Sequence, residues 1–350
     1  MMEACFAQAG AETTRVDVES AIDTPPAGWD EFYRACSYVH PYQSSAFGRW
    51  ESFRRNRVMY LSIAKCGMKV GQCLVSLSPH GIARWYFGPV LSDTAGFQFD
   101  DALAAVVRYL KNCGVVAIGH SLTPPAYGRS TAVPEPSVGV ACHTLLIDLT
   151  QPVETLLKAF DRTVRKNVRK CRERQVQVRV SEGDGAALEA YVKLLAEHRK
   201  KLGLPMPPFY PNRDSVRCFA ASSARLLVAL ASVDGQAMAG LGFAVLNKVA
   251  VEVGVAQSAD YDALKLPLQD FIKAEACGAL ASAGVEVYDL AGVSLAARNR
   301  KEESIRRFKQ KFSNRLSMYH SIDLRFKALR YYYCRAVAKV GRMFSSEYLF

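Results

Sequence analysis

The sequence predicts a mixed α/β chain built from two similar halves. Its 350 residues suit two domains better than one, because single hydrophobic cores rarely grow to that size. Half of the residues are hydrophobic and 22% are charged, which is the composition of an ordinary globular protein. Each half shows strands in hairpins, then a helix, then one further strand, and this alternation indicates mixed sheets packed against helices.

In the first half, apolar and charged residues alternate over 15–20, which predicts a strand. Two further strands, 58–65 and 69–76, meet at Gly67 and predict a hairpin. The other elements predicted for this half are the helices 29–37, 44–54 and 100–111, the strands 83–87, 115–118 and 140–149, and the proline-rich loop 123–137.

In the second half, the turn sequences Asp234-Gly235 and Asn247-Lys248 separate three apolar runs and predict three strands joined by turns. The elements predicted for this half are helix 162–174, strand 176–180, helix 186–202, strands 225–231, 237–246 and 249–256, helix 264–283 and strand 285–290. A last amphipathic helix is predicted over 325–342.

The stretch 285–312 combines a strand with a cationic helix. The strand closes on Gly292, which predicts a tight exit from the sheet. In the helix, apolar residues recur three and four apart, so one face belongs to the core and the other is cationic. The apolar residues are Ile305, Phe308 and Phe312, and the cations are Arg306, Arg307, Lys309 and Lys311. A strand that ends in a carboxylate, followed by such a helix, is suited to hold an anionic substrate.

Five segments carry a family resemblance. In chain order they are Tyr42-Gln43-Ser44-Ser45 leading to Trp50, Tyr86-Phe87-Gly88-Pro89-Val90, Thr163 to Lys170, Tyr288-Asp289-Leu290-Ala291-Gly292, and Ile305 to Phe312. Together they resemble the FemABX-type transferases, in which a Tyr-Asp-Leu-x-Gly strand precedes an aromatic-lysine pair. The resemblance implies an α/β fold with mixed sheets and two tandem GNAT-like acyltransferase domains. The expected domains are 11–150 and 151–324, the second with the acceptor site, followed by a basic amphipathic helix in 325–350.

The resemblance also implies an activity, the transfer of an acyl group, often an aminoacyl group from charged tRNA, onto an amine of a cell-wall precursor. Such a reaction needs an aligned carbonyl and a stabilised oxyanion, but neither a metal nor a covalent nucleophile. The six histidines show no metal-ligand spacing, and no Gly-x-Ser-x-Gly elbow occurs. We therefore expect no metal and no tightly bound cofactor, with aminoacyl-tRNA or acyl-CoA as the acyl donor.

Two departures from related proteins bear on the donor. Acetyl-CoA-dependent relatives hold pyrophosphate on a glycine-rich loop at a helix start, whereas 257–267 contains no glycine. The long helical hairpin that some cell-wall members use as a tRNA arm is also missing, since no uninterrupted heptad pair occurs. The sequence leaves the choice of donor open.

Two carboxylates are candidates for proton transfer. Glu252 lies in the apolar strand 249–256, where burial would raise its pKa towards that of a general base. The alternative is the solvated face of the strand, opposite its valines. Asp289 ends its strand beside a glycine exit, where sites form in α/β sheets, or else it caps a turn.

The candidate substrate-binding residues are cations on two helices. Lys309 matches the lysine of the family's aromatic-lysine segment, for which the resemblance implies contact with a substrate phosphate or stabilisation of the reacting carbonyl. Its neighbours Arg306 and Arg307 carry guanidinium groups that suit phosphates. In the basic helix 162–174, Arg165 and Arg169 are candidates for contact with a tRNA backbone or a lipid pyrophosphate. The alternative in each case is a solvated basic face.

The charge balance favours anionic partners, because 45 Lys and Arg against 33 Asp and Glu give a formal charge of +12. We expect a nucleotide-linked or lipid-linked saccharide precursor, with tRNA and the inner face of the cell membrane as further candidates. Ten scattered cysteines without a CxxC pair fit a reducing cytosol, and the first ten residues lack the features of a secretory signal. The expected location is cytoplasmic, with the tail helix docked on the protein or lying on an anionic leaflet.

Three functions are compatible with the sequence. The first is a FemABX-like acyltransferase that acts on an amine of a peptidoglycan or polysaccharide precursor of the cell envelope. The second is an acyl-CoA-dependent N-acetyltransferase in exopolysaccharide biosynthesis. The third is a non-catalytic basic binding module on the same scaffold.

Overall fold

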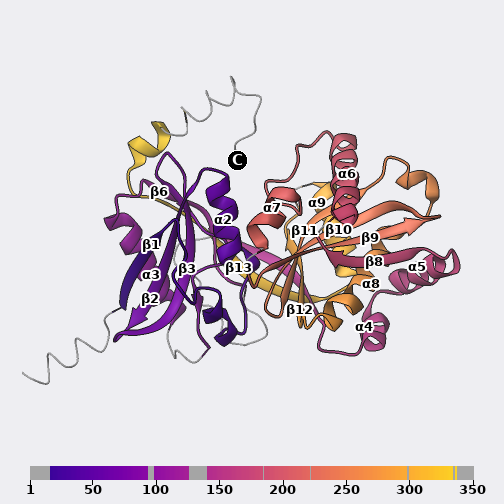
Figure 1. Cartoon of the computed structure of the whole chain (residues 1–350), viewed down its shortest axis with the longest axis horizontal. Helices are drawn as coiled ribbons and strands as arrows, with labels where there is room; N and C mark the ends of the chain where they lie inside the picture. The colour runs from indigo at the N-terminus through magenta and orange to yellow at the C-terminus, as the bar shows by residue number, and fades with distance from the viewer. Residues whose placement is uncertain are drawn as a thin grey trace, which may run out of the picture. The chain divides into compact units, whose positions relative to one another are not determined.

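The structure, a computed structural model, describes residues 16–93, 98–125, 140–183, 185–220, 222–297, 299–333 and 336. These residues form two compact units (Figure 1). The first unit holds the described residues up to Ala141 and those from Tyr319 onwards, and the second holds Cys142 to Met318. Strand β13 (Arg315–Arg325) begins in the second unit and ends in the first, so the chain returns to the unit from which it started.

In the first unit, the strands lie side by side in the order β1, β2, β3, β4, β6 and β13. Strands β4 and β6 run parallel, the neighbouring pairs run antiparallel, and β5 pairs with β3. The strands not yet defined are β1 (Val16–Ile22), β2 (Arg57–Lys65), β3 (Met68–Leu77), β4 (Ile82–Arg84), β5 (Val90–Leu91) and β6 (Ala117–Leu122). The helices are η1 (Glu31–Ala35), η2 (Pro41–Gln43), α2 (Ser45–Phe53) and α3 (Phe99–Asn112).

The motif that begins at Tyr42 connects several elements of the first unit through the hydrogen bonds of Gln43. The Gln43 side chain accepts a hydrogen bond from the backbone N–H of Leu74 (2.8 Å) and donates one to the backbone carbonyl of Tyr86 (2.7 Å). The backbone carbonyl of Gln43 accepts from the indole of Trp29 (2.9 Å). Because these groups are buried, each bond prevents the cost of an unpaired polar atom. The motif thereby joins the start of α2 to β3 and to the segment after β4.

The second unit repeats this topology. Its strands follow the order β7, β12, β11, β10, β9 and β8, and β11 and β12 form its parallel pair. The succession β8 to β12 corresponds to the succession β1 to β6: antiparallel neighbours, then a parallel partner reached through a helix. The strands are β7 (Val140–Asp148), β8 (Gln177–Glu182), β9 (Arg225–Val233), β10 (Gln236–Leu246), β11 (Val249–Gln257) and β12 (Val287–Val293). A mixed α/β fold of two similar units, as predicted, is thus present.

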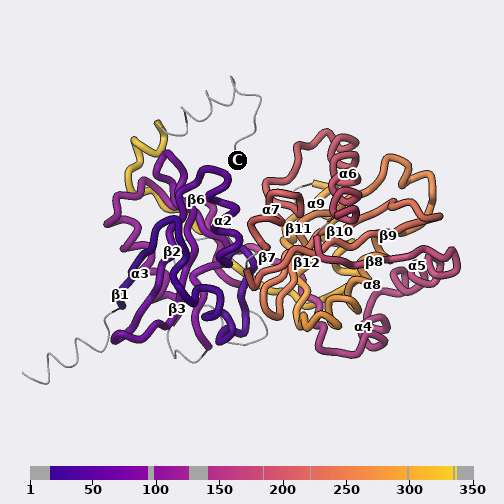
Figure 2. The backbone as a smooth tube through the Cα atoms, in the orientation of Figure 1, coloured from indigo at the N-terminus to yellow at the C-terminus, as the bar shows by residue number. Residues whose placement is uncertain are grey.

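Helices cover both faces of the second sheet (Figure 1). On one face, α6 packs its buried Tyr191 against a track of glycines in β10 and β11. On the other face, α8 packs against Phe243 and its neighbours, with α4 and α5 beside it (Figure 2). The glycines are needed because a Cβ at Gly242 would lie only 2.6 Å from the Tyr191 phenol oxygen. The helices are α4 (Val153–Ala159), α5 (Arg162–Glu173), α6 (Gly185–Lys201), α7 (Arg213–Phe219), α8 (Leu268–Ser282) and α9 (Arg300–Gln310).

Several elements differ from the prediction. The predicted helix 264–283 begins at Leu268, because Pro267 occupies its N-cap and the preceding residues form the 3-10 helix η3 (Tyr261–Leu264). The predicted helix 29–37 is the short 3-10 helix η1, and strand 83–87 is the shorter β4. Strand β13 and helices α4 and α7 were not predicted. The predicted loop 123–137 falls outside the described residues from position 126 onwards.

In the tail, the structure describes only the first turns of the predicted helix 325–342. Tyr331 is buried, whereas Leu329 and Tyr333 are 90% and 70% exposed, so these two side chains are not docked on the described part of the protein. Most of the remaining tail lies outside the described residues.

Candidate active site

The candidate site lies where the parallel strands β11 and β12 part. They pair over three residues each, ending with Val251 opposite Asp289, although both strands continue. Glu252 is the next residue of β11, and directly after it a bulge opposite Gly242 and Phe243 shifts the register with β10. A bulge bends its strand and redirects side chains. Glu252 shares a face with the buried Ala250 and points towards α8.

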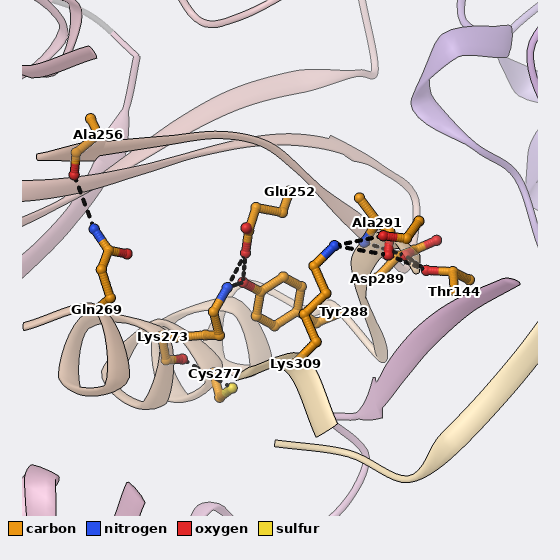
Figure 3. A network of polar contacts seen from close by, with 11 residues as sticks. Thr144, Glu252, Ala256, Gln269, Lys273, Cys277, Tyr288, Asp289, Ala291 and Lys309 are labelled. Atoms are coloured by element: carbon orange, nitrogen blue, oxygen red, sulfur yellow. Dashed lines mark hydrogen bonds and ion pairs between the residues drawn. The ribbon is translucent and has the colours of Figure 1, made fainter. Parts of the chain in front are cut away.

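Three side chains meet in a buried network at this point (Figure 3). Lys273 of α8 and Tyr288 of β12 both donate hydrogen bonds to Oε2 of Glu252, the phenol at 2.6 Å. The Lys273 ammonium also lies 3.3 Å from the Tyr288 hydroxyl, which closes the triangle. The side chains of Lys273 and Glu252 are 1% and 7% exposed. The network therefore holds an ion pair almost entirely away from water.

The pKa of Glu252 corrects one expectation. Burial by itself raises this pKa, but the positive charges of Lys273 and Lys309 and the hydrogen bonds from Lys273 and Tyr288 outweigh it, and the pKa is lowered from its usual 4.5. The prediction that burial would raise the pKa of Glu252 was wrong, because it did not include Lys273. The predicted solvated position is wrong as well, since the carboxylate is buried.

Lys309 of α9 reaches the same place from the other side. Its ammonium donates to the backbone carbonyls of Ala291 (3.2 Å) and Gly292 (2.9 Å) at the exit of β12. Figure 3 shows it between Glu252 and that exit. Burial lowers its pKa, which the nearby Glu252 carboxylate partly offsets. Because an ammonium has three donors, one N–H of Lys309 remains beyond these two bonds.

Asp289 holds the turn that positions these carbonyls. Its Oδ1 accepts from the backbone N–H of Ala291 (2.7 Å) and lies within hydrogen-bonding distance of the Thr144 hydroxyl. Ala291 has a positive φ of 62°, an uncommon conformation that such bonds stabilise. These are the contacts of a turn-holding carboxylate, and a role of Asp289 in proton transfer stays a prediction.

The four candidate arginines do not converge on Lys309. Arg306 donates to the carbonyl of Leu295 (2.7 Å), and Arg165 donates to that of Phe160 (2.6 Å). The other two pair along their own helices, Arg307 with Glu303 and Arg169 with Glu173. Their guanidinium groups thus have local partners, and a contact of these arginines with substrate stays a prediction.

Sequence reasoning missed Lys273. A signal was present, because Lys273 shares one helical stripe with Cys277 and Leu280, both buried. A lysine on an apolar stripe needs a buried partner, and the strand carboxylate Glu252 supplies it. Ile305 was placed on the core face of α9, but it is 41% exposed.

The start of α8 has its backbone amides occupied. The N–H groups of Asp270 and Phe271 both bond to the Pro267 carbonyl (3.1 and 3.2 Å), and that of Gln269 bonds to the Tyr261 hydroxyl (3.2 Å). The buried Asp270 carboxylate lies in the same turn. A helix start binds phosphate through open amides and a positive field. This one offers a carboxylate and amides that are already bonded.

A separate cavity of about 630 Å³ lies between β7, α4 and the segment that follows α9. Its walls carry the ion pair of Asp148 with Arg315 (3.4 Å), and neither Glu252 nor Lys309 lines it. Among the described residues, no group of His, Cys, Asp or Glu could hold a metal ion, and none of the described helices is long and apolar enough to span a membrane.

Comparison with solved structures identifies the fold. FemX superimposes with a TM-score of 0.66 at 11% identity, over 87% of this chain and 97% of its own. The chain has a FemX-like fold. L-PGS from Bacillus licheniformis follows with a TM-score of 0.56 at 11% identity (86% of this chain, 92% of that one). A protein assigned as the C-terminal domain of a lysylphosphatidylglycerol synthetase from Agrobacterium fabrum gives 0.53 at 16% identity (83% and 92%).

The predicted resemblance to the FemABX-like fold is thereby confirmed. No family model matches the chain, and no curated protein matches its sequence. At identities this low, the likeness concerns the fold, and the residues of the site have to carry the functional argument.

Proposed function

We propose that the protein is an acyltransferase that moves an aminoacyl or other acyl group from an activated ester onto an amine of a cell-envelope precursor. The observation that carries this proposal is the meeting of Lys309 and Glu252 where β11 and β12 part, in a FemX-like fold. A cation and a carboxylate side by side suit a reaction in which an amine attacks a carbonyl. The name of the lysylphosphatidylglycerol synthetase, which joins an amino acid to a phospholipid, supports an aminoacyl group and an acceptor of the cell envelope.

In the proposed reaction, the nitrogen lone pair of the acceptor amine attacks the ester carbonyl. The remaining N–H of Lys309 donates to the oxyanion that forms, and a fixed donor stabilises this charge more than water does. Glu252 accepts a hydrogen bond from the attacking amine, whose proton passes to the leaving ester oxygen when the C–O bond breaks. An amide and a free hydroxyl result, so that atoms and charge balance.

We propose an aminoacyl ester of tRNA rather than acyl-CoA as the donor. The support is the start of α8, where the first amides are bonded within the protein and are not open to a pyrophosphate. The second candidate, a CoA-dependent N-acetyltransferase of polysaccharide assembly, requires a phosphate site elsewhere in the chain. The third candidate, a non-catalytic binding module, requires that Lys309 and Glu252 bind a ligand without any acyl transfer.

The deciding experiment gives the purified full chain one labelled donor at a time, aminoacyl-tRNA or acetyl-CoA, with a lipid-linked or nucleotide-linked amino-sugar acceptor. We expect labelled amide product from aminoacyl-tRNA. Product from acetyl-CoA alone would overturn the donor assignment, and product from neither donor would favour the binding module.

We further propose that the acceptor is met at an anionic membrane surface. Leu329 and Tyr333 are one helical turn apart, largely exposed, and flanked by Arg325 and Arg330. From 325 to 346 the sequence has six Lys and Arg and no Asp or Glu. Exposed aromatic and apolar groups among cations fit the headgroup region of anionic lipids.

Vesicle sedimentation tests this surface. The protein should bind vesicles that contain phosphatidylglycerol and not pure phosphatidylcholine vesicles, and Leu329→Ser with Tyr333→Ser should reduce binding several-fold, since each loses buried apolar area. The matched control replaces another exposed apolar residue, Met68 (71% exposed), with serine. Equal binding by the double variant and the control would contradict the proposal.

A further inference from the structure

Lys273 is a buried cation that takes no direct part in the proposed transfer. It is fully buried, and its helix neighbours Ile272, Ala274 and Cys277 belong to the main hydrophobic cluster of the second unit. Replacing a buried ion pair by apolar groups is often neutral or stabilising, so the pair that Lys273 forms with Glu252 contributes little to stability by itself. A buried ion pair beside a candidate reaction centre instead indicates a role in arranging that centre.

The hydrogen bonds show which oxygen of Glu252 is held in place. Lys273 and Tyr288 approach the same oxygen of Glu252, Oε2, from α8 and β12. Among the described residues, none donates a hydrogen bond to the other oxygen, Oε1. Two bonds to one oxygen fix the plane of the carboxylate and leave its second oxygen to accept a hydrogen bond from elsewhere.

Lys273 also determines where the ammonium of Lys309 lies. Both cations interact with Glu252, and Lys309 is held away from it by its bonds to the carbonyls of Ala291 and Gly292. Without Lys273, Glu252 would be a buried carboxylate with Lys309 as the remaining cation nearby. Because an unpaired buried charge is costly, the flexible Lys309 side chain would turn towards Glu252 and leave the carbonyls.

We propose that Lys273 and Tyr288 are positioning residues: they hold Oε2 of Glu252, so that Oε1 faces the acceptor amine and Lys309 stays free to donate to the reacting carbonyl. This inference rests on the proposed function for its kinetic consequences, but not for its geometry. The titratable groups that face Glu252 are Lys273 from α8, Tyr288 from β12 and Lys309 from α9, while Cys277 and Asp289 interact with Tyr288.

The test combines Lys273→Met with Glu252→Gln. Methionine keeps the apolar stem but removes the ammonium. Without it, the pKa of Glu252 should rise, which an NMR titration of labelled glutamate carboxyls detects, with Glu252→Gln assigning the signal. The acid limb of the pH profile of kcat/KM should move to higher pH for the same reason.

The double variant tests whether Lys273 acts through Glu252. Glu252→Gln alone should lower kcat by about 10²–10⁴-fold, and adding Lys273→Met to it should cause little further loss.

Two controls separate positioning from structural damage. Lys248→Met breaks a matched but exposed pair with Glu286 (2.6 Å) and should leave the titration and the pH profile unchanged. Tyr288→Phe removes the second bond to Oε2 and should raise the pKa of Glu252 in the same direction, which tests the network if Lys273→Met does not fold.

Failure of the positioning role and failure of the proposed acyltransferase function give different results. An unshifted Glu252 titration in a folded Lys273→Met or Tyr288→Phe variant, or losses of Lys273→Met and Glu252→Gln that multiply, would overturn the positioning role. Wild-type protein that transfers from neither donor would end the proposed function, and the titration would still test the geometry.

Discussion

Replacing Lys309 with methionine tests the proposed mechanism most directly. Methionine keeps much of the apolar stem but removes the ammonium, which donates to the carbonyls of Ala291 (3.2 Å) and Gly292 (2.9 Å). Because these bonds hold the ammonium in place, its remaining N–H reaches an oxyanion without reorganisation. Loss of one such donor costs roughly 2.7–4 kcal/mol of transition-state stabilisation, so kcat should fall by about 10²–10³-fold.

The fold should survive this change, since the substitution removes a desolvated charge together with its two bonds. We expect the free energy of unfolding, measured in urea, to change by less than about 2 kcal/mol. The matched control is Lys301→Met on the same helix, an exposed lysine, which should transfer at nearly the wild-type rate. Single-turnover transfer of a labelled aminoacyl group measures both variants. A folded Lys309→Met variant that transfers as fast as Lys301→Met would refute the assignment.

Two further predictions concern stability. Gly254→Ala should destabilise the second unit by about 1–3 kcal/mol, because its Cβ would overlap the phenol oxygen of Tyr191, and Tyr191→Phe in the same chain should recover part of that loss. Additive costs in urea denaturation would contradict this contact. Burial holds the pKa of His40 well below 6.5, so stability should be complete above pH 6.5 and fall as the pH drops, by up to about 1.4 kcal/mol per pH unit. His40→Asn should flatten this slope in unfolding curves recorded between pH 5 and 8, and an unchanged slope would show that other groups cause it.

Local patterns predicted the hairpin strands well, because their turns are built from residues that favour tight turns. Gly67 has a φ of 77° and joins β2 to β3, and Asp234-Gly235 joins β9 to β10, both with positive φ. Strand β13 was missed although Leu316, Met318, Ile322 and Leu324 alternate with polar residues, as expected of a strand.

The site was only partly predictable, because its residues come from separate elements. Lys309 was found through its motif, and its place at the exit of β12 agrees with the expected strand-and-helix arrangement. The helical stripe of Lys273 indicated that it is buried, but no local pattern named its partner, since Glu252 is 21 residues away in the chain. Without that contact, the sign of the pKa shift of Glu252 followed from burial alone and came out wrong.

The repeated topology shows why the chemistry is assigned to the second unit. In the first unit, the parallel strands β4 and β6 pair up to Ala83, and the next residues of the chain are Arg84 and Trp85. The Arg84 side chain donates to the backbone carbonyl of Gly119 (3.2 Å), and the buried Trp85 donates its indole N–H to that of Gly88 (2.9 Å). The corresponding point of the second unit holds Glu252 with its two lysines. The same backbone divergence therefore holds one cation, Arg84, which is bonded to the backbone in the first unit, and a buried carboxylate between two lysines in the second. The proposed acyl transfer needs both an acceptor and a donor of hydrogen bonds, and the second unit supplies this pair.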